Sequence, residues 1–336
     1  LVCYSNGAQL EKVLAHWSEL PNLHTAVLLR GEVPQGTGRS ILPWEALMAE
    51  GRARESERPE VRRWAEQRKP DDLLTLIYTS GTTADPKGAM LTHGNVVSNV
   101  HAALKALPLR EGDRCLSFLP LTHIFERMAG HFCMWHIGSS IYYAESVNTV
   151  ASDLLVARPT VLCSVPRIYE KIYARIQDTV AAGSLLKRLI FHWAFEVGRE
   201  AVGLLYEDKP VTGWLGFKYG VARKLVFDKI LARTGGRIRF ACSGGAPLSA
   251  KLMEFFWIIG LPILEGYGLT ETSPVICVNM PGAVGPGTVG HPLYDLWEGR
   301  PFMKIAEDGE VLCQGPNVMR GYWNNPQATA EAIDAD

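Results

Sequence analysis

The chain has 336 residues, of which 47% are hydrophobic and 21% are charged, and its formal net charge is −1. This composition excludes a disordered or low-complexity chain and predicts a soluble globular protein with two or three subdomains. Because a nearly neutral chain has no general attraction for a polyanion, nucleic acid is not expected as a partner.

Short β-rich runs alternate with amphipathic stretches along most of the chain. Strands are predicted at residues 25–29, 73–79, 115–119, 140–143, 160–165, 238–242 and 262–265. Helices are predicted at residues 9–20, 95–107, 167–180, 185–205 and 248–259. This alternation predicts an α/β architecture of layered βαβ subdomains with mostly parallel, buried strands. Ligands on such sheets gather at the carboxyl ends of the strands.

After about residue 275 the pattern changes, because Gly and Pro become frequent and the strands become short, as at residues 310–313. We therefore expect α/β subdomains over residues 1–275 and a small partial β-barrel subdomain over residues 276–336. The chain opens on Leu1 rather than Met and closes within a helix-like segment, so we expect an N-terminally incomplete fragment.

The seven cysteines lie far apart with no CxxC pair, which favours reduced thiols and a cytoplasmic protein. The longest apolar run, residues 255–264, is too short to span a bilayer. Residues 51–70 carry seven basic side chains interleaved with glutamates, which favours a solvated, salt-bridged surface segment. Peripheral contact of this segment with a membrane stays open.

The most informative segment reads Tyr-Thr-Ser-Gly-Thr-Thr-Ala-Asp-Pro-Lys-Gly, at residues 78–88, directly after an apolar strand. Its glycines let the backbone approach a ligand, and its hydroxyl and N–H groups can donate to phosphate oxygens. Lys87 adds a positive charge suited to a polyphosphate. Because Gly88 follows Lys87, this is not the P-loop pattern GxxxxGK[ST]. As a bare Gly/Ser/Thr loop it could equally be a surface turn.

The eleven-residue string as a whole resembles the signature of the adenylate-forming superfamily, which includes acyl-CoA synthetases, luciferases and peptide-synthetase adenylation domains. The resemblance implies that this loop holds the β- and γ-phosphates of ATP. The ATP-binding residues that it implies here are Thr79, Ser80, Gly81, Thr82, Thr83 and Lys87.

Two later segments agree with the superfamily in the expected order. Residues 243–248 follow a predicted strand, and the resemblance implies that Gly244, Gly245 and Ala246 border the adenine. Residues 265–272 read Glu-Gly-Tyr-Gly-Leu-Thr-Glu-Thr. Tyr267 is suited to stacking on a purine, Thr270 to bonding the α-phosphate and Glu271 to holding Mg²⁺ together with Thr79. Glu265, Gly266 and Gly268 complete the implied ATP site, and Lys87, Thr270 and Glu271 are its implied catalytic residues.

Residues 119–127 resemble the family's Pro-Leu-x-His-x-Phe-Glu segment, which implies that His123 and Phe125, with Gly245, line the acyl-substrate site. A structural role for His123 stays open. Glu126 and Arg127 are expected to form a supporting pair. Residues 165–172 resemble the long-chain fatty acyl branch in particular, although an amphipathic helix with Pro in its first turn explains them as well. Residues 287–290 and 315–323 match late landmarks that are expected to be structural.

The resemblance, which spans at least residues 70–330, implies ATP- and Mg²⁺-dependent activation of a long-chain fatty acid as an acyl-adenylate, followed by transfer to coenzyme A. The family's Gly-Trp-x-x-Thr-Gly-Asp motif and its mobile C-terminal domain with a catalytic lysine have no counterpart in the sequence, so weak ATP binding and poor turnover are expected. A fatty acyl-AMP ligase, another adenylation domain with a different acceptor, or an inactive nucleotide-binding homologue are the alternatives. Chain-length preference and oligomeric state stay open.

Overall fold

The computed structural model describes residues 1–79, 85–296 and 298–334, and the chain forms two compact units, Leu1–Arg68 and Lys69–Asp336. In the first unit, three parallel strands form a sheet in the order β1 (Val2–Tyr4), β2 (Thr25–Leu28) and β3 (Ser40–Pro43). Helices α1 (Gly7–Leu14) and α2 (Trp44–Ala53) accompany it, and Leu10, Trp17 and Leu28 form its small core.

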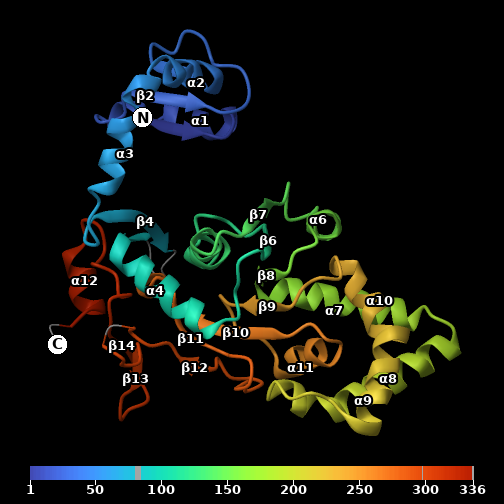
Figure 1. Cartoon of the computed structure of the whole chain (residues 1–336). Helices are drawn as coiled ribbons and strands as arrows, with labels where there is room; N and C mark the ends of the chain where they lie inside the picture. The colour runs from blue at the N-terminus through green and yellow to red at the C-terminus, as the bar shows by residue number, and fades with distance from the viewer. Residues whose placement is uncertain (80–84, 297, 335–336) are drawn as a thin grey trace. The chain divides into compact units, whose positions relative to one another are not determined.

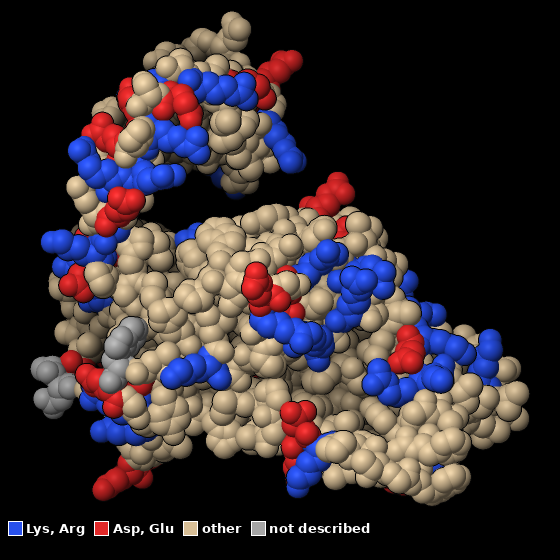
Figure 2. Space-filling model, in the orientation of Figure 1, with Lys and Arg blue, Asp and Glu red and all other residues tan. Residues whose placement is uncertain are grey.

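The charged segment over residues 51–70 is exposed and salt-bridged, as its composition predicted, and most of it is helical. It includes the end of α2 and all of α3 (Arg58–Glu66), in which no described residue is buried. Ion pairs one helical turn apart join Arg54 to Glu57 at 2.8 Å, Arg58 to Glu55 at 2.8 Å and Arg63 to Glu60 at 3.0 Å. Figure 2 shows basic and acidic side chains side by side on this unit. Such exposed pairs contribute little to stability.

The second unit is built on a seven-stranded sheet in the order β12-β11-β10-β9-β8-β6-β7 (Figure 1). Its strands are β6 (Arg114–Ser117), β7 (Ser140–Tyr143), β8 (Val161–Ser164), β9 (Phe240–Ser243), β10 (Ile263–Gly268), β11 (Val275–Val278) and β12 (His291–Pro292). The five strands from β7 to β10 are parallel, whereas β11 is antiparallel to both of its neighbours, β10 and β12. The predicted α/β architecture with a mostly parallel sheet is confirmed.

Helices connect and cover these strands. They are α4 (His93–Ala106), α5 (Cys133–His136), α6 (Val150–Ala157), α7 (Pro166–Ala181), α8 (Leu185–Tyr206), α9 (Gly213–Ala222), α10 (Asp228–Leu231), α11 (Ala250–Ile258) and α12 (Pro326–Ala332). Helix α4 begins at a capping box formed by Thr92 and Asn95, and Pro166 occupies the first turn of α7. Two π-helical turns, Glu126–Phe132 and Arg223–Phe227, lie among them. No helix in the described ranges is both long and apolar enough to cross a membrane.

Two hydrophobic cores pack against the sheet. Leu116 belongs to a core that includes Phe191 of α8 and Phe256 of α11, whereas its neighbour Cys115 belongs to a core that includes Val100 of α4. Because successive residues of a strand point to opposite faces, β6 contributes to both cores. The sheet therefore lies between two hydrophobic cores, one on each face.

Asn99 joins α4 to the edge strand β11. Its side-chain amide donates to the carbonyl oxygen of Val275 at 2.7 Å and accepts from the Val275 N–H at 3.1 Å. Asn99 is fully buried, so these bonds replace water at two backbone groups. The side chain thereby fixes where β11 begins.

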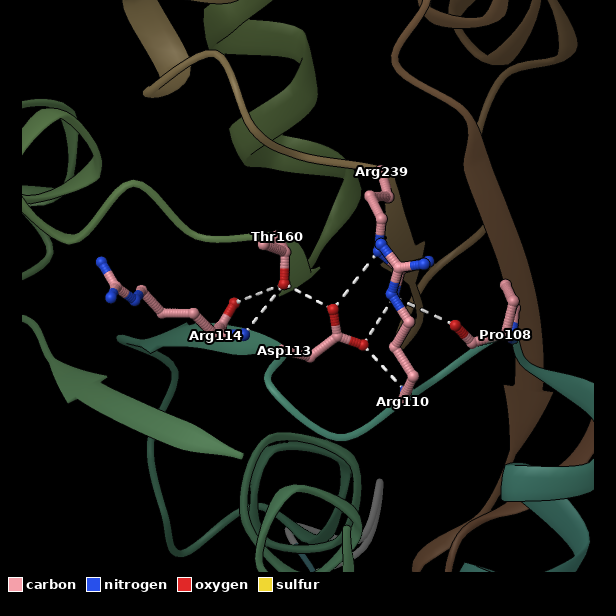
Figure 3. A network of polar contacts seen from close by, with 6 residues as sticks. All are labelled: Pro108, Arg110, Asp113, Arg114, Thr160 and Arg239. Atoms are coloured by element: carbon pink, nitrogen blue, oxygen red, sulfur yellow. Dashed lines mark hydrogen bonds and ion pairs between the residues drawn. The ribbon is translucent and has the colours of Figure 1, made fainter. Parts of the chain in front are cut away.

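A buried ionic network holds together the beginnings of β6, β8 and β9 (Figure 3). The Asp113 carboxylate accepts hydrogen bonds from the Thr160 hydroxyl at 2.7 Å, the Arg110 N–H at 2.9 Å and the Arg239 guanidinium at 2.5 Å. Burial by itself would raise the pKa of Asp113, but these donors outweigh it and lower the pKa. Asp113 is therefore a fixed negative charge at neutral pH.

Two strand pairs lie beside the main sheet. β13 (Met303–Ile305) and β14 (Val311–Cys313) are antiparallel, and β4 (Leu73–Thr79) pairs with β5 (Lys87–Thr92) as a hairpin. β11 and β12 belong to the seven-stranded sheet although they lie after residue 274. In the sequence, the boundary between the compact units falls between Arg68 and Lys69, and a further division at residue 275 stays a prediction.

The seven cysteines are free, and five of them are buried. Cys163 of β8 lies opposite Cys242 of β9 in the sheet. Hydrogen bonding to Cys163 and burial raise the pKa of Cys115, and burial raises that of Cys133 to about 12. Such thiols stay protonated and are poor nucleophiles.

Candidate active site

A cavity of about 410 Å³ opens beside the carboxyl ends of β8, β9 and β10, where the sheet topology predicts a ligand. Its polar lining comes from the end of β4 and from the turns that follow β9 and β10. The residues that share this position are Thr79, Ser243, Gly244, Gly245, Gly266, Tyr267, Gly268, Thr270 and Glu271. Segments far apart in the sequence therefore meet at one cavity.

Apart from His123, the rest of the cavity is lined by apolar residues and cysteines. Its wall is formed by residues of α4, the π-helical turn Glu126–Phe132, α5 and the ends of the sheet strands. These residues include Ala103, Leu107, Leu109, Met128, Cys133, Met134, Val161 and Leu264. A cavity with a few polar groups and an extensive apolar wall suits a ligand that is polar at one part and aliphatic at another.

The phosphate-loop prediction falls partly outside the described residues. Ser80, Gly81, Thr82 and Thr83 are among the residues that the structure does not describe. The residues on either side form the last pair of the β4 and β5 hairpin, where Thr79 lies opposite Lys87. Thr79 lines the cavity, whereas Lys87 does not. The predicted loop is therefore the connection between these two strands.

The turn over residues 265–272 is shaped by close backbone approach. A Cβ atom on Gly268 would collide with the carbonyl oxygen of Pro274, so only glycine fits there. The register of β10 against β11 shifts between Tyr267 and Gly268. The Thr272 hydroxyl closes the turn by donating to the Pro274 carbonyl oxygen at 2.6 Å. Tyr267 lines the cavity and remains 38% exposed.

The turn after β9 contains two glycines, and the first of them lies against an aromatic ring. The Phe125 ring lies 3.4 Å from the position that a Cβ atom of Gly244 would occupy. Gly245 adopts φ of +80°, a left-handed conformation that favours glycine. Predicted adenine-site and acyl-site residues are thus in contact, while Ala246 does not line the cavity.

Glu265 supports this turn from the interior. It is 4% exposed, and its Oε1 accepts a hydrogen bond from the Leu248 N–H at 2.8 Å. Burial raises the pKa of the Glu265 carboxyl. Glu265 does not line the cavity, so contact between its side chain and a nucleotide stays a prediction.

The acyl-segment residues His123 and Phe125 both line the cavity. Nδ1 of His123 accepts a hydrogen bond from the Phe125 N–H at 3.2 Å, which fixes the ring against its own turn. The expected pairing of Glu126 with Arg127 is wrong. Arg127 instead donates to the Leu121 carbonyl oxygen at 2.9 Å and to the Thr75 hydroxyl at 2.5 Å. The two neighbouring side chains leave the helical turn in different directions, so adjacency in sequence does not make them a pair.

Glu126 is instead buried without its expected partner. It is 1% exposed, and among the described residues neither carboxylate oxygen has a hydrogen-bond partner of ordinary geometry. Burial raises its pKa to about 7. The Glu126 carboxyl therefore changes between its protonated and its charged form near neutral pH.

The sequence reasoning missed Tyr322, which lies between two predicted site residues. Its hydroxyl donates to Oε1 of Glu271 at 2.6 Å, and Nζ of Lys87 lies 5.3 Å from the centroid of its ring. Tyr322 stands in the segment over residues 315–323 that was expected to be structural. The local sequence Gly-Tyr-Trp does not indicate which distant carboxylate the tyrosine hydroxyl contacts.

The geometry and the sequence define the class of the protein. Residues 15–323 match the sequence profile of the AMP-binding enzyme family, and the chain belongs to that family. The predicted resemblance to adenylate-forming enzymes is confirmed.

Similar proteins indicate which branch of the family this chain resembles. The chain is 34% identical to long chain acyl-CoA synthetase 7, peroxisomal, of Arabidopsis thaliana, over 97% of this chain and 47% of that protein. It is 39% identical to long-chain-fatty-acid–CoA ligase FadD15 of Mycobacterium bovis, over 78% of this chain and 42% of that protein. The chain thus spans about half the length of these curated relatives.

Solved structures share the fold. MatB from Rhodopseudomonas palustris matches with a TM-score of 0.60 and 23% identity, over all of this chain and 54% of that one. At this level of identity the likeness establishes the fold of the adenylate-forming enzymes and carries no statement about substrate.

Proposed function

We propose that the protein activates a long-chain fatty acid with ATP to give an acyl-adenylate and pyrophosphate, and then forms a thioester with coenzyme A. The observation that supports this proposal most directly is the shared cavity. Thr79 beside the loop, the turn over residues 266–271 and an apolar wall meet around one space. A nucleotide and an aliphatic acid could therefore be held next to each other, which is what adenylation requires.

The chemistry needs charge neutralisation more than a covalent enzyme intermediate. A carboxylate oxygen of the fatty acid attacks the α-phosphorus of ATP, and the bond to the leaving pyrophosphate breaks. Lys87 would offset phosphate charge, Thr270 would donate to an α-phosphate oxygen and Tyr267 would stack on the adenine. In the second step the sulfur of coenzyme A attacks the acyl carbon, AMP leaves and the thiol proton is released.

Magnesium fits the side chains at the cavity. The Glu271 carboxylate and the Thr79 hydroxyl are hard oxygen donors, and both residues line the same space. Mg²⁺ is commonly held by one or two protein oxygens while substrate phosphates and water supply the rest. When bound, the ion would neutralise phosphate charge, and Glu271 and Thr79 would hold it.

The direct test is pyrophosphate exchange that depends on a long-chain fatty acid, measured on the complete gene product. We expect Lys87→Ala and Glu271→Ala each to lower the exchange rate by about 100-fold, because preorganised charge at a reacting phosphate is lost. Lys304→Ala and Glu310→Ala, which change exposed residues of the β13 and β14 region, serve as matched controls. Exchange at the wild-type rate in both site variants would refute the assignment.

A second measurement identifies the acyl acceptor and distinguishes the synthetase from the alternative functions. Release of AMP that requires coenzyme A supports the synthetase, whereas adenylate formation without thioester would indicate an acyl-AMP ligase or another adenylation domain. Nucleotide binding without any exchange would indicate an inactive homologue.

A further inference from the structure

We infer that Tyr322 is a positioning residue that sets the Glu271 carboxylate and the Lys87 ammonium in place for magnesium nucleotide. This inference rests on the proposed function, and it adds a residue that touches neither ligand in the proposed chemistry. The geometry that points to it consists of two side-chain contacts and a set of backbone bonds.

The side-chain contacts connect the two halves of the site. The Tyr322 hydroxyl donates to Oε1 of Glu271 at 2.6 Å, a short bond typical of a carboxylate acceptor. The same ring faces Nζ of Lys87 at 5.3 Å, within the range of a cation–π contact. One phenol therefore holds an anion through its hydroxyl and a cation through its ring.

The backbone around Tyr322 is fastened to both partners. The Trp323 N–H donates to the Gly88 carbonyl oxygen at 2.8 Å, and the Met90 N–H donates to the Gly321 carbonyl oxygen at 2.9 Å. On the other side, the Met319 N–H donates to the Glu271 carbonyl oxygen at 2.7 Å. Residues 319–323 thus bond to the strand that begins at Lys87 and to the turn that carries Glu271.

Tyr322 also has little freedom to move. It is 8% exposed, and its N–H donates to the Thr329 hydroxyl oxygen at 2.9 Å. The phenol bonds Oε1 of Glu271, and among the described residues no side-chain or backbone donor is hydrogen-bonded to Oε2. Groups that orient a metal-binding carboxylate typically contribute 10-fold to 100-fold to metal affinity or activity.

Tyr322→Phe separates the two contacts, because it removes the hydroxyl and retains the ring. We expect affinity for a fluorescent ATP analogue to fall about 10-fold in the presence of Mg²⁺ and to change little in EDTA. Tyr322→Leu removes the ring as well, so its affinity should fall in EDTA too. A general loss of structure would lower both affinities in both variants, which distinguishes positioning from folding.

The control is another tyrosine whose hydroxyl is buried. The Tyr206 hydroxyl has no hydrogen-bond partner among the described residues, so Tyr206→Phe should bind as the wild type does in either buffer. Combining Tyr322→Phe with Glu271→Gln should weaken Mg²⁺-dependent affinity no more than Glu271→Gln alone, since the phenol acts through that carboxylate. Additive losses would overturn the inference.

The outcomes distinguish this inference from the function on which it rests. Wild-type protein that binds magnesium nucleotide, with Tyr322→Phe binding equally well, would overturn the inference and leave the function standing. Wild-type protein that binds no nucleotide would overturn both. Should Tyr322→Phe unfold, a crystal structure of the wild-type complex decides: we expect the phenol within hydrogen-bond distance of Glu271, and a separation beyond about 4 Å would refute the role.

Discussion

At the residue scale, Glu126 is a buried carboxyl next to the candidate site, and its charge depends on pH. Glu126 lies on a π-helical turn, a form that occurs frequently at functional sites. It is adjacent in sequence to Phe125, which lines the cavity. Because burial raises its pKa to about 7, the folded protein binds a proton there that the unfolded chain releases near pH 4.5.

This difference predicts how stability depends on pH. A carboxyl whose pKa is raised in the folded state loses stability as pH rises from 4.5 through about 7, and the loss reaches about 3 kcal/mol above that range. Glu126→Gln cannot ionise, so its free energy of unfolding should fall less between pH 5 and pH 8. Urea unfolding measures both. Glu111→Gln, at an exposed position, is the control, and an unchanged pH dependence in Glu126→Gln would contradict the assignment.

At the element scale, the order of the strands depends on the ionic network at their beginnings. Asp113 precedes β6, Thr160 precedes β8 and Arg239 precedes β9, and all three meet in one cluster. The network lies at the amino ends of the parallel strands, whereas the cavity lies beside their carboxyl ends. The two ends of the sheet thus serve different purposes, one for stability and one for ligands.

Asp113→Asn should lower the free energy of unfolding by about 2 kcal/mol at pH 7, because buried hydrogen bonds to a charge are lost. The pKa of Asp113 is lowered in the folded state, so its stabilisation is present above pH 3.8 and is lost as pH falls through the folded pKa. The difference between wild type and variant should therefore shrink in acid. Urea unfolding across this range, with exposed Asp178→Asn for comparison, provides the measurement.

The five parallel strands of the seven-stranded sheet could be predicted from the sequence to within a few residues, because most of them are continuous apolar runs. The short strands β1 and β3 of the first unit were not predicted. β5, which begins at Lys87 and contains Gly88, was not predicted, since its length and composition resemble the end of a loop. The π-helical turn leaves no periodic signal that differs from an α-helix. Thr79, His123, Tyr267 and Glu271 were placed by motif, whereas Tyr322 required the tertiary structure because its partners are distant in sequence.

At the scale of the whole molecule, the candidate site belongs to one compact unit. Every residue that lines the cavity lies between Lys69 and Asp336. Leu1–Arg68 has its own sheet and its own small core. Units with separate cores can in principle fold separately.

A chain that begins at Lys69 should therefore retain the nucleotide affinity of the 336-residue chain to within a factor of about 2. Circular dichroism on heating and fluorescence titration with the ATP analogue test this on both lengths. A shortened chain that folds but binds more than about tenfold weaker would show that the first unit contributes to the site.

The hydrogen bonds made by residues 316–323 also determine when, during synthesis of the chain, the candidate site can form. Asn95, just after β5, donates to the Pro316 carbonyl oxygen across 221 positions of sequence, and Ala89 bridges to Tyr322. During synthesis the β4 and β5 hairpin leaves the ribosome long before these partners are made. Such long-range closure is slow, so the candidate site is completed only after residues 316–323 have been made, well after the β4 and β5 hairpin.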